Sequence, residues 1–299
     1  MPSRRHEFLA NTIPRLRRAG DLESEPVERA RVEARHLTRR LGLPTRAVPR
    51  FDKRFSVVTE DLGFPSYVIT PRHREPARTL YYVHGGGFTA GIDAFHVRHA
   101  TALAGRIDAR VVMPDYPLTP EHTWRESHDA LVEQAGRFAD IPGGIVLSGD
   151  SSGGGLALAL AISMRERGLT PATDLVLHAP WVDLTTSTPE TKDHDAIDPW
   201  LFFSKMQVYA AWWAGSPDDL GRPEVSPALA DLHDLPRALQ LYGSRDLLAP
   251  GCRLLARRAA EAGWDLTSIE EPDLIHVYGI LPFIPEARRA MRQIVGFLA

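Results

Sequence analysis

Hydrophobic positions change their spacing near residue 53, which divides the chain into two parts. Before that point apolar side chains recur every three or four positions, as in amphipathic helices. The clearest such stripe consists of Val27, Ala30, Ala34, Leu37 and Leu41. We expect residues 1–50 to be a helical segment that packs through this stripe, either as an ordinary structural layer or as a lid over a site.

After residue 53, short runs of β-branched and aromatic residues alternate with longer runs of helical spacing. The expected strands cover residues 55–58, 67–69, 79–83, 110–113, 144–147, 174–178, 238–242 and 266–270. The expected helices cover residues 94–106, 124–140, 152–168, 250–263 and 284–298. Alternating strands and helices form right-handed crossovers and a mostly parallel sheet. The pattern predicts an α/β fold with about eight strands, an antiparallel edge made by the first two, and helices on both faces.

The stretch from about 184 to 225 interrupts the alternation and contains no clear strand. It holds three of the six tryptophans, Trp200, Trp212 and Trp213. It is either an ordinary excursion packed on the domain or an apolar cap that walls a pocket. We favour the cap, because the stretch lies just before the last two strands of the sheet.

A candidate nucleophile lies in the run Gly149-Asp150-Ser151-Ser152-Gly153, between an expected strand and an expected helix. This is the pattern G-x-S-x-G, in which a sharp turn lifts a serine hydroxyl clear of a sheet. Glycines fit there because side chains at Gly149 and Gly153 would collide with neighbouring segments. The motif alone also fits a plain Gly/Ser loop. Other parts of the sequence are needed to distinguish a nucleophile turn from such a loop.

A serine hydroxyl needs a base, usually a histidine oriented by a carboxylate. In α/β folds that carry a G-x-S-x-G turn between a strand and a helix, the order along the chain is serine, acid, histidine. These groups lie at the carboxyl ends of strands. Asp246 follows the expected strand 238–242, and His276 follows the strand 266–270. Asp273 is a rival acid. The other histidines beyond Ser151 lie inside a strand, in the excursion or near its end.

Attack on an ester also requires hydrogen-bond donors for the oxyanion that forms. The run His84-Gly85-Gly86-Gly87-Phe88 directly follows the strand 79–83. An HGGG loop in this position supplies oxyanion donors in lipases and esterases. We therefore expect the backbone N–H groups of Gly85, Gly86 and Ser152 to bind the oxyanion.

These motifs resemble those of the hormone-sensitive-lipase-like esterases in the α/β-hydrolase superfamily. Two runs, HGGGF at 84–88 and GDSSGG at 149–154, are similar to the family's HGGGF and GDSAGG. Further similarities lie at 115–122, 180–184, 198–201 and 275–278. The departures include Ser152 in place of an alanine and Arg245 just before the acid. None of them removes a catalytic group.

The resemblance runs from about residue 55 to the end, matches the first 50 residues only in their being helical, and implies an α/β-hydrolase fold with a helical cap. From the sequence pattern we expect an N-terminal helical cap segment at 1–50 and a catalytic domain at 51–299 with a cap insertion at about 184–225. The resemblance also implies a serine carboxylesterase for short- to medium-chain acyl esters that needs no metal or cofactor. Phe88, Trp200 and Leu201 are the candidate substrate contacts. An N-acetyl or amide hydrolase or a lactonase would use the same groups, and a non-catalytic ligand-binding protein on this scaffold is a further alternative.

Composition limits the partners and the compartment. The formal net charge is −3, which gives no strong field for nucleic acid or an anionic membrane. No apolar run approaches the ~20 residues of a membrane span. Cys252 is the only cysteine, so no intrachain disulfide can form, which fits a reducing cytoplasm. We expect a cytoplasmic enzyme that acts on a small-molecule ester, with a homodimer as a possible assembly.

Overall fold

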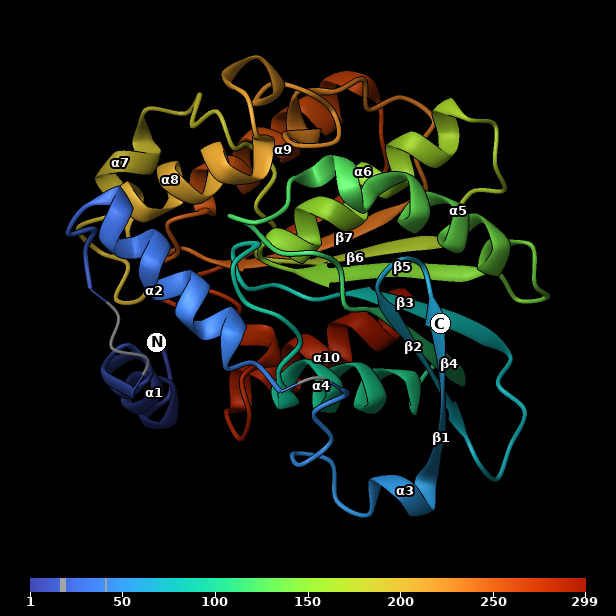
Figure 1. Cartoon of the computed structure of the whole chain (residues 1–299). Coiled ribbons are helices and arrows are strands. Elements are labelled where there is room, and N and C mark those ends of the chain that lie inside the picture. The colour runs from blue at the N-terminus through green and yellow to red at the C-terminus, as the bar shows by residue number, and fades with distance from the viewer. Residues whose placement is uncertain (17–19, 41) are drawn as a thin grey trace.

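The computed structural model describes residues 1–16, 20–40 and 42–299, so that Leu41 of the predicted stripe lies outside it. The chain folds around one eight-stranded sheet (Figure 1). Its strands are β1 (Phe55–Asp61), β2 (Pro65–Pro71), β3 (Arg78–Val83), β4 (Ala109–Pro114), β5 (Ile145–Asp150), β6 (Asp174–His178), β7 (Ala238–Gly243) and β8 (Leu266–Glu271). Their order across the sheet is β1-β2-β4-β3-β5-β6-β7-β8. β2 pairs antiparallel with β1 and β4, and every later pair is parallel, which confirms the predicted sheet and its antiparallel edge.

Helices cover both faces of this sheet (Figure 1). One face carries α4 (Ala94–Ala104) and α10 (Pro285–Phe297), and the other carries α5 (His128–Ala139), α6 (Ser152–Glu166) and α9 (Ala249–Ala262). Successive side chains of a strand point to opposite faces, so each inner strand contributes to two cores. In β3, for example, Leu80 and Tyr82 belong to one buried cluster, whereas Tyr81 and Val83 belong to the other.

The predicted helix over residues 124–140 is divided into a 3-10 turn, η1 (Trp124–Glu126), and α5. The Glu126 carboxylate accepts hydrogen bonds from the backbone N–H of Thr123, at 2.8 Å, and from its hydroxyl, at 2.6 Å. These contacts close a tight turn, and Ser127 then leaves helical geometry with φ of −127°. The division is therefore a capping effect that hydrophobic spacing does not report.

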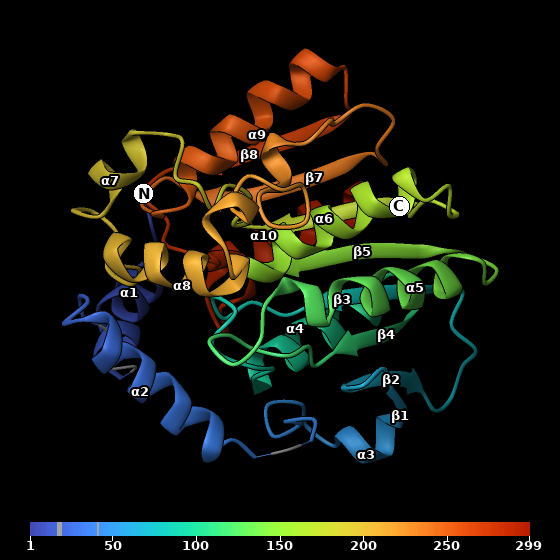
Figure 2. The same cartoon turned by 45° about the horizontal axis from the view of Figure 1, so that its top comes forward.

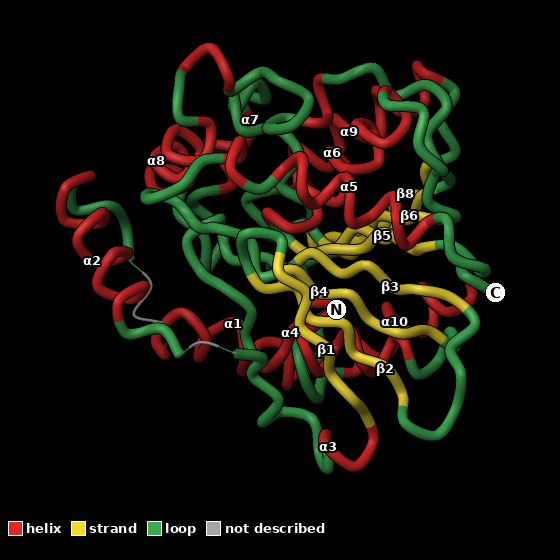
Figure 3. Tube along the Cα trace, turned by 45° about the vertical axis from the view of Figure 1, so that its right-hand side comes forward, coloured by secondary structure: helices red, strands yellow, loops and turns green. Residues whose placement is uncertain are grey.

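Four helices lie at one end of the sheet, beyond the carboxyl ends of the central strands (Figures 1 and 2). They are α1 (Arg4–Leu16), α2 (Glu25–Leu37), α7 (Glu190–His194) and α8 (Phe203–Ala214). The excursion at 184–225 holds α7, α8 and the 3-10 turn η2 (Pro217–Asp219). α3 (Phe51–Arg54) leads into β1, and the 3-10 turns η3 (Pro227–Leu229) and η4 (Tyr278–Ile280) lie in later loops. Figure 3 shows α1 and α2 to one side of the strand layer.

Helix α2 packs with a different face from the one that its apolar stripe predicts. Val27, Ala30, Ala34 and Leu37 are all exposed, and the side chain of Leu37 is 88% exposed. The buried residues of the helix are Val32 and Glu28. The prediction that this stripe faces the protein is therefore wrong.

The reason lies in the surface that α8 offers. Tyr209 donates its hydroxyl hydrogen to Glu28, whose carboxylate also lies 3.4 Å from the ammonium group of Lys205. Trp212 donates its indole N–H to Glu25 at 2.8 Å. These carboxylates of α2 satisfy donors of α8, and with that face directed at α8 the apolar stripe of α2 faces solvent.

Candidate active site

Ser151 occupies the sharp turn between β5 and α6. Its φ of 54° and ψ of −126° are strained for a residue with a side chain. A Cβ atom at Gly149 would lie 2.3 Å from the carbonyl oxygen of Gly153, and one at Gly153 would lie 2.3 Å from the carbonyl oxygens of Val83 and His84. The predicted reason for both glycines, the close approach of neighbouring backbone, is confirmed.

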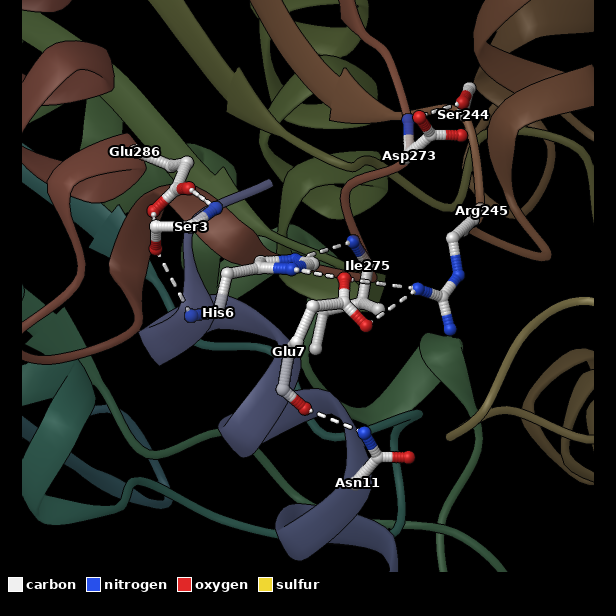
Figure 4. Close-up of polar contacts among 9 residues, drawn as sticks. All are labelled: Ser3, His6, Glu7, Asn11, Ser244, Arg245, Asp273, Ile275 and Glu286. Atoms are coloured by element: carbon white, nitrogen blue, oxygen red, sulfur yellow. Dashed lines mark hydrogen bonds and ion pairs between the residues drawn. The ribbon is translucent and has the colours of Figure 1, made fainter. Parts of the chain in front are cut away.

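The structure brings Ser151, His276 and Asp246 together in one hydrogen-bonded row. The hydroxyl oxygen of Ser151 lies 2.9 Å from Nε2 of His276, and Nδ1 of that ring lies 2.8 Å from Oδ2 of Asp246. All three residues are buried. The rival acid, Asp273, is exposed, and its backbone N–H donates to Ser244 at 2.8 Å (Figure 4). Asp246 is therefore the carboxylate that contacts the imidazole.

The charge around His276 makes its ring a better base. Burial lowers the pKa of this imidazole, but the nearby carboxylate of Asp246 and its hydrogen bond outweigh burial, and the net shift is upward. When Nδ1–H donates to Asp246, Nε2 is left as the acceptor for the hydroxyl hydrogen of Ser151. The arrangement can thus remove a proton from Ser151 and hold it.

Asp198 is a second buried carboxyl beside this row, and the sequence analysis gave it no role. Its Oδ2 accepts the N–H of Leu247 at 2.7 Å, and its Oδ1 accepts the N–H groups of Trp200 at 2.7 Å and of Leu201 at 3.0 Å. Burial first, and then the charge of Asp246, raise the pKa of Asp198 to about 6. The one available signal was its position in the 198–201 run, which resembled a family motif.

The predicted oxyanion donors are only partly free. The N–H of Gly85 donates to Oδ1 of Asp150 at 3.2 Å, so its expected role as an oxyanion donor stays a prediction that this contact does not favour. Within the described parts of the chain, the N–H groups of Gly86, Gly87 and Ser152 meet no acceptor. Three neighbouring donors therefore remain unpaired next to the turn that holds Ser151.

Asp150 has a structural reason to occupy the Gly85 amide. It is buried, and it also accepts the hydroxyl hydrogen of Tyr82 at 2.7 Å. Burial raises the pKa of this carboxyl, but the ring of His96 and the hydrogen bonds outweigh it and hold the pKa well below its usual range. The charged carboxylate joins β3, β5 and the HGGG loop behind Ser151.

The three predicted substrate contacts have different surroundings. Phe88 is only 2% exposed and stacks on Trp213 with ring centroids 4.2 Å apart. It is a core residue, so its expected contact with substrate stays a prediction that this burial does not favour. Trp200 and Leu201 are half-buried, and the Trp200 ring meets that of His276 edge-on with centroids 5.7 Å apart.

Among residues 1–16, 20–40 and 42–299, no group of three or more histidine, cysteine or acidic side chains could hold a metal ion. Over the same residues, no helix is both long and apolar enough to cross a membrane.

Comparisons with known proteins agree with this fold. Residues 80–280 match a family described as having the α/β-hydrolase fold. An esterase of Acinetobacter venetianus is 30% identical over 222 residues, which cover 73% of this chain and 73% of that protein. An acetyl-hydrolase of Streptomyces hygroscopicus is 31% identical over 229 residues, which cover 75% and 76% of the two chains.

A solved structure extends the likeness to the whole chain. An esterase from the bacterial hormone-sensitive lipase family superposes with a TM-score of 0.81 at 25% identity, over 100% of this chain and 98% of the other. The fold, the motifs and these relatives lead to one assignment. The chain belongs to the hormone-sensitive-lipase-like esterase family of the α/β-hydrolase fold.

Proposed function

We propose that this protein is a serine carboxylesterase that hydrolyses short- to medium-chain acyl esters through an acyl-enzyme intermediate. The observation that carries the proposal is the row formed by Ser151, His276 and Asp246, with contacts of 2.9 and 2.8 Å. The names of the relatives, an esterase and an acetyl-hydrolase, support an ester substrate.

In the proposed reaction, Ser151 attacks the carbonyl carbon of the ester while His276 takes the hydroxyl proton. Asp246 keeps the imidazole in the required tautomer and stabilises its charged form. His276 then gives the proton to the leaving alcohol, which completes the acyl-enzyme. A water molecule attacks next, again with His276 as the base, and the released acid restores Ser151.

The oxyanion would be held by the N–H groups of Gly86, Gly87 and Ser152. The absence of acceptors for them among the described residues supports this assignment. Gly87, which the sequence analysis did not include, replaces Gly85, whose N–H is taken by Asp150. Each such donor contributes a factor of roughly 100 to 1000 in rate.

We further propose that residues 1–50 and about 184–225 form a cap on the catalytic domain at 51–299. Support comes from Asp198 and Trp200, which lie in the excursion and contact the segments that carry Asp246 and His276. In this arrangement Trp200 and Leu201 limit the length of the acyl chain. A homodimer remains a prediction, to be tested by light scattering on the purified protein.

The name of the Streptomyces relative favours a second candidate, the removal of acetyl groups from an amide or an ester. The same intermediates serve esters, N-acetyl amides and lactones, so the triad does not separate them. Rates measured over p-nitrophenyl esters, N-acetyl amides and lactones would rank the three classes.

The central test is Ser151→Ala, which should abolish hydrolysis of p-nitrophenyl acetate and butyrate in a folded protein. The matched control is Ser163→Ala. Ser163 also contacts a histidine, with its hydroxyl oxygen 2.7 Å from Nε2 of His128, but lies further along α6. Labelling by a fluorophosphonate should require Ser151 and not Ser163. Activity retained by Ser151→Ala would refute the mechanism, and an unlabelled wild type would favour a non-catalytic scaffold.

A further inference from the structure

Helix α1 contacts the residues that directly precede Asp246 and His276 (Figure 4). Nε2 of His6 accepts the backbone N–H of Ile275 at 3.1 Å. The guanidinium of Arg245 lies 3.3 Å from the carboxylate of Glu7. His6 is completely buried. Two consecutive residues of the N-terminal helix therefore reach both loops of the candidate active site.

The donor at Ile275 defines the form of the His6 ring. Because a backbone N–H can only donate, Nε2 must be unprotonated, and Nδ1 carries the ring hydrogen. Nδ1 lies 3.3 Å from Oε1 of Glu7, which can accept it. Burial lowers the pKa of His6, and the neighbouring Glu7 only partly opposes this effect. The neutral ring is thus the stable form, and it supplies the single acceptor that Ile275 needs.

The two loops are also tied to each other. The N–H of Arg245 donates to the carbonyl of Leu274 at 3.1 Å, and the N–H of Ser244 donates to that of Glu271 at 2.9 Å. A displacement of the β8 loop would therefore be passed to the loop that holds Asp246.

Helix α1 is in turn fastened to α10. The N–H and the hydroxyl of Ser3 donate to the two carboxylate oxygens of Glu286 at 2.6 and 3.0 Å, and Glu286 is buried. Ala10 of α1 lies in the buried cluster beneath α4 and α10. These contacts make α1 a fixed support for the loops, which is the opposite of a moving lid.

We infer that His6 is a positioning residue for His276 and acts by holding the peptide N–H of Ile275. The inference rests on the proposed function, because it concerns the geometry of that reaction. Ile275 is adjacent to His276, so a shift of its peptide moves the imidazole relative to Ser151. A misplacement of about 1 Å in an active site lowers the rate about 100-fold. The pairing of Glu7 also gives Arg245, a departure from the family pattern, a defined partner.

The test compares His6→Leu, which keeps bulk but removes the acceptor, with His6→Gln, whose amide oxygen can take the place of Nε2. The control is Asn11→Leu, since the side chain of Asn11 donates to the carbonyl of Glu7 in its own helix and has no other hydrogen bond among the described residues. Each variant is measured for kcat, for KM and for hydrogen exchange of the peptide 272–281. Exchange reports the Ile275 contact even if no substrate is turned over.

We expect His6→Leu to exchange faster over 272–281 and to lose kcat by about 10- to 100-fold with little change in KM. His6→Gln should restore both properties, and Asn11→Leu should match the wild type. A folded His6→Leu with wild-type kcat and exchange would overturn the inference, as would a His6→Gln no better than His6→Leu. If His6→Leu does not fold, Ser3→Ala loosens α1 more gently and should change both readouts in the same direction; unchanged values would count against the inference. A wild type that exchanges slowly but hydrolyses no ester would overturn the proposed function instead.

Discussion

Replacing His178 by leucine should make the protein less sensitive to acid. His178 lies in β6 behind Ser151 and is 1% exposed. Neither of its ring nitrogens has a hydrogen-bond partner among the described residues. Its ring meets that of His99, also buried, edge-on at 4.8 Å. A proton on His178 would thus place a charge where no acceptor solvates it.

The sign and size follow from the pKa of His178, which burial lowers from 6.5 to about 4 although the charge of Asp150 opposes the shift. Well above pH 6.5 the ring is neutral in both the folded and the unfolded chain, so it has no effect on the free energy of unfolding. As the pH falls, the unfolded chain binds a proton first, and the free energy of unfolding decreases. One pKa unit is worth about 1.4 kcal/mol, so the loss from this ring is about 2 kcal/mol between pH 7.5 and 5, and about 3 kcal/mol below pH 4.

The assay is urea unfolding of wild type and His178→Leu at pH 7.5 and 5, followed by circular dichroism. The decrease in the free energy of unfolding between the two pH values should be about 2 kcal/mol smaller in the variant. Comparing the two pH values separates titration from any change in packing. The control is His73→Leu, which removes an exposed histidine in place of a buried one. It should show the same decrease in the free energy of unfolding between pH 7.5 and 5 as the wild type. If His178→Leu also shows the wild-type decrease, the buried ring does not titrate as argued.

Four further substitutions test the site and the backbone packing. Asp198→Asn removes a charge that raises the pKa of His276, so the acidic limb of the kcat/KM profile should move to lower pH; an unmoved limb would contradict this. Gly149→Ala places a Cβ 2.3 Å from a backbone oxygen and should lower the free energy of unfolding by more than about 3 kcal/mol. Gly296→Ala, with open space around it in α10, should raise the same quantity by about 0.5–1 kcal/mol, and urea unfolding checks both. Trp200→Ala should increase kcat/KM for longer p-nitrophenyl esters relative to the acetate, and an equal ratio would rule out Trp200 as a limit on acyl length.

The sequence by itself determined the sheet and the place of its polar loops. Strand and helix periodicities are local properties, so all eight strands and the five flanking helices lie close to their predicted positions. The carboxyl ends of parallel strands converge on one edge. For that reason the order Ser151, Asp246, His276 was enough to predict that these residues meet, although their catalytic roles remain proposals.

Only the tertiary structure decided which groups are free and which are occupied. The amide of Gly85 is lost to Asp150, 65 positions away, and Phe88 is buried against Trp213. The N–H of Ile275 reaches His6 across 269 positions. The amino-acid sequence does not indicate which acceptor a given backbone amide will meet in the folded chain.

The same holds for the face with which a helix packs. α2 directs Glu25 and Glu28 toward α8, where Trp212 and Tyr209 donate hydrogen bonds to them. An apolar stripe indicates only the hydrophobic free energy that a helix would gain if that face were buried. The partner surface decides which face is used, because a donor left unpaired in an interface destabilises the fold.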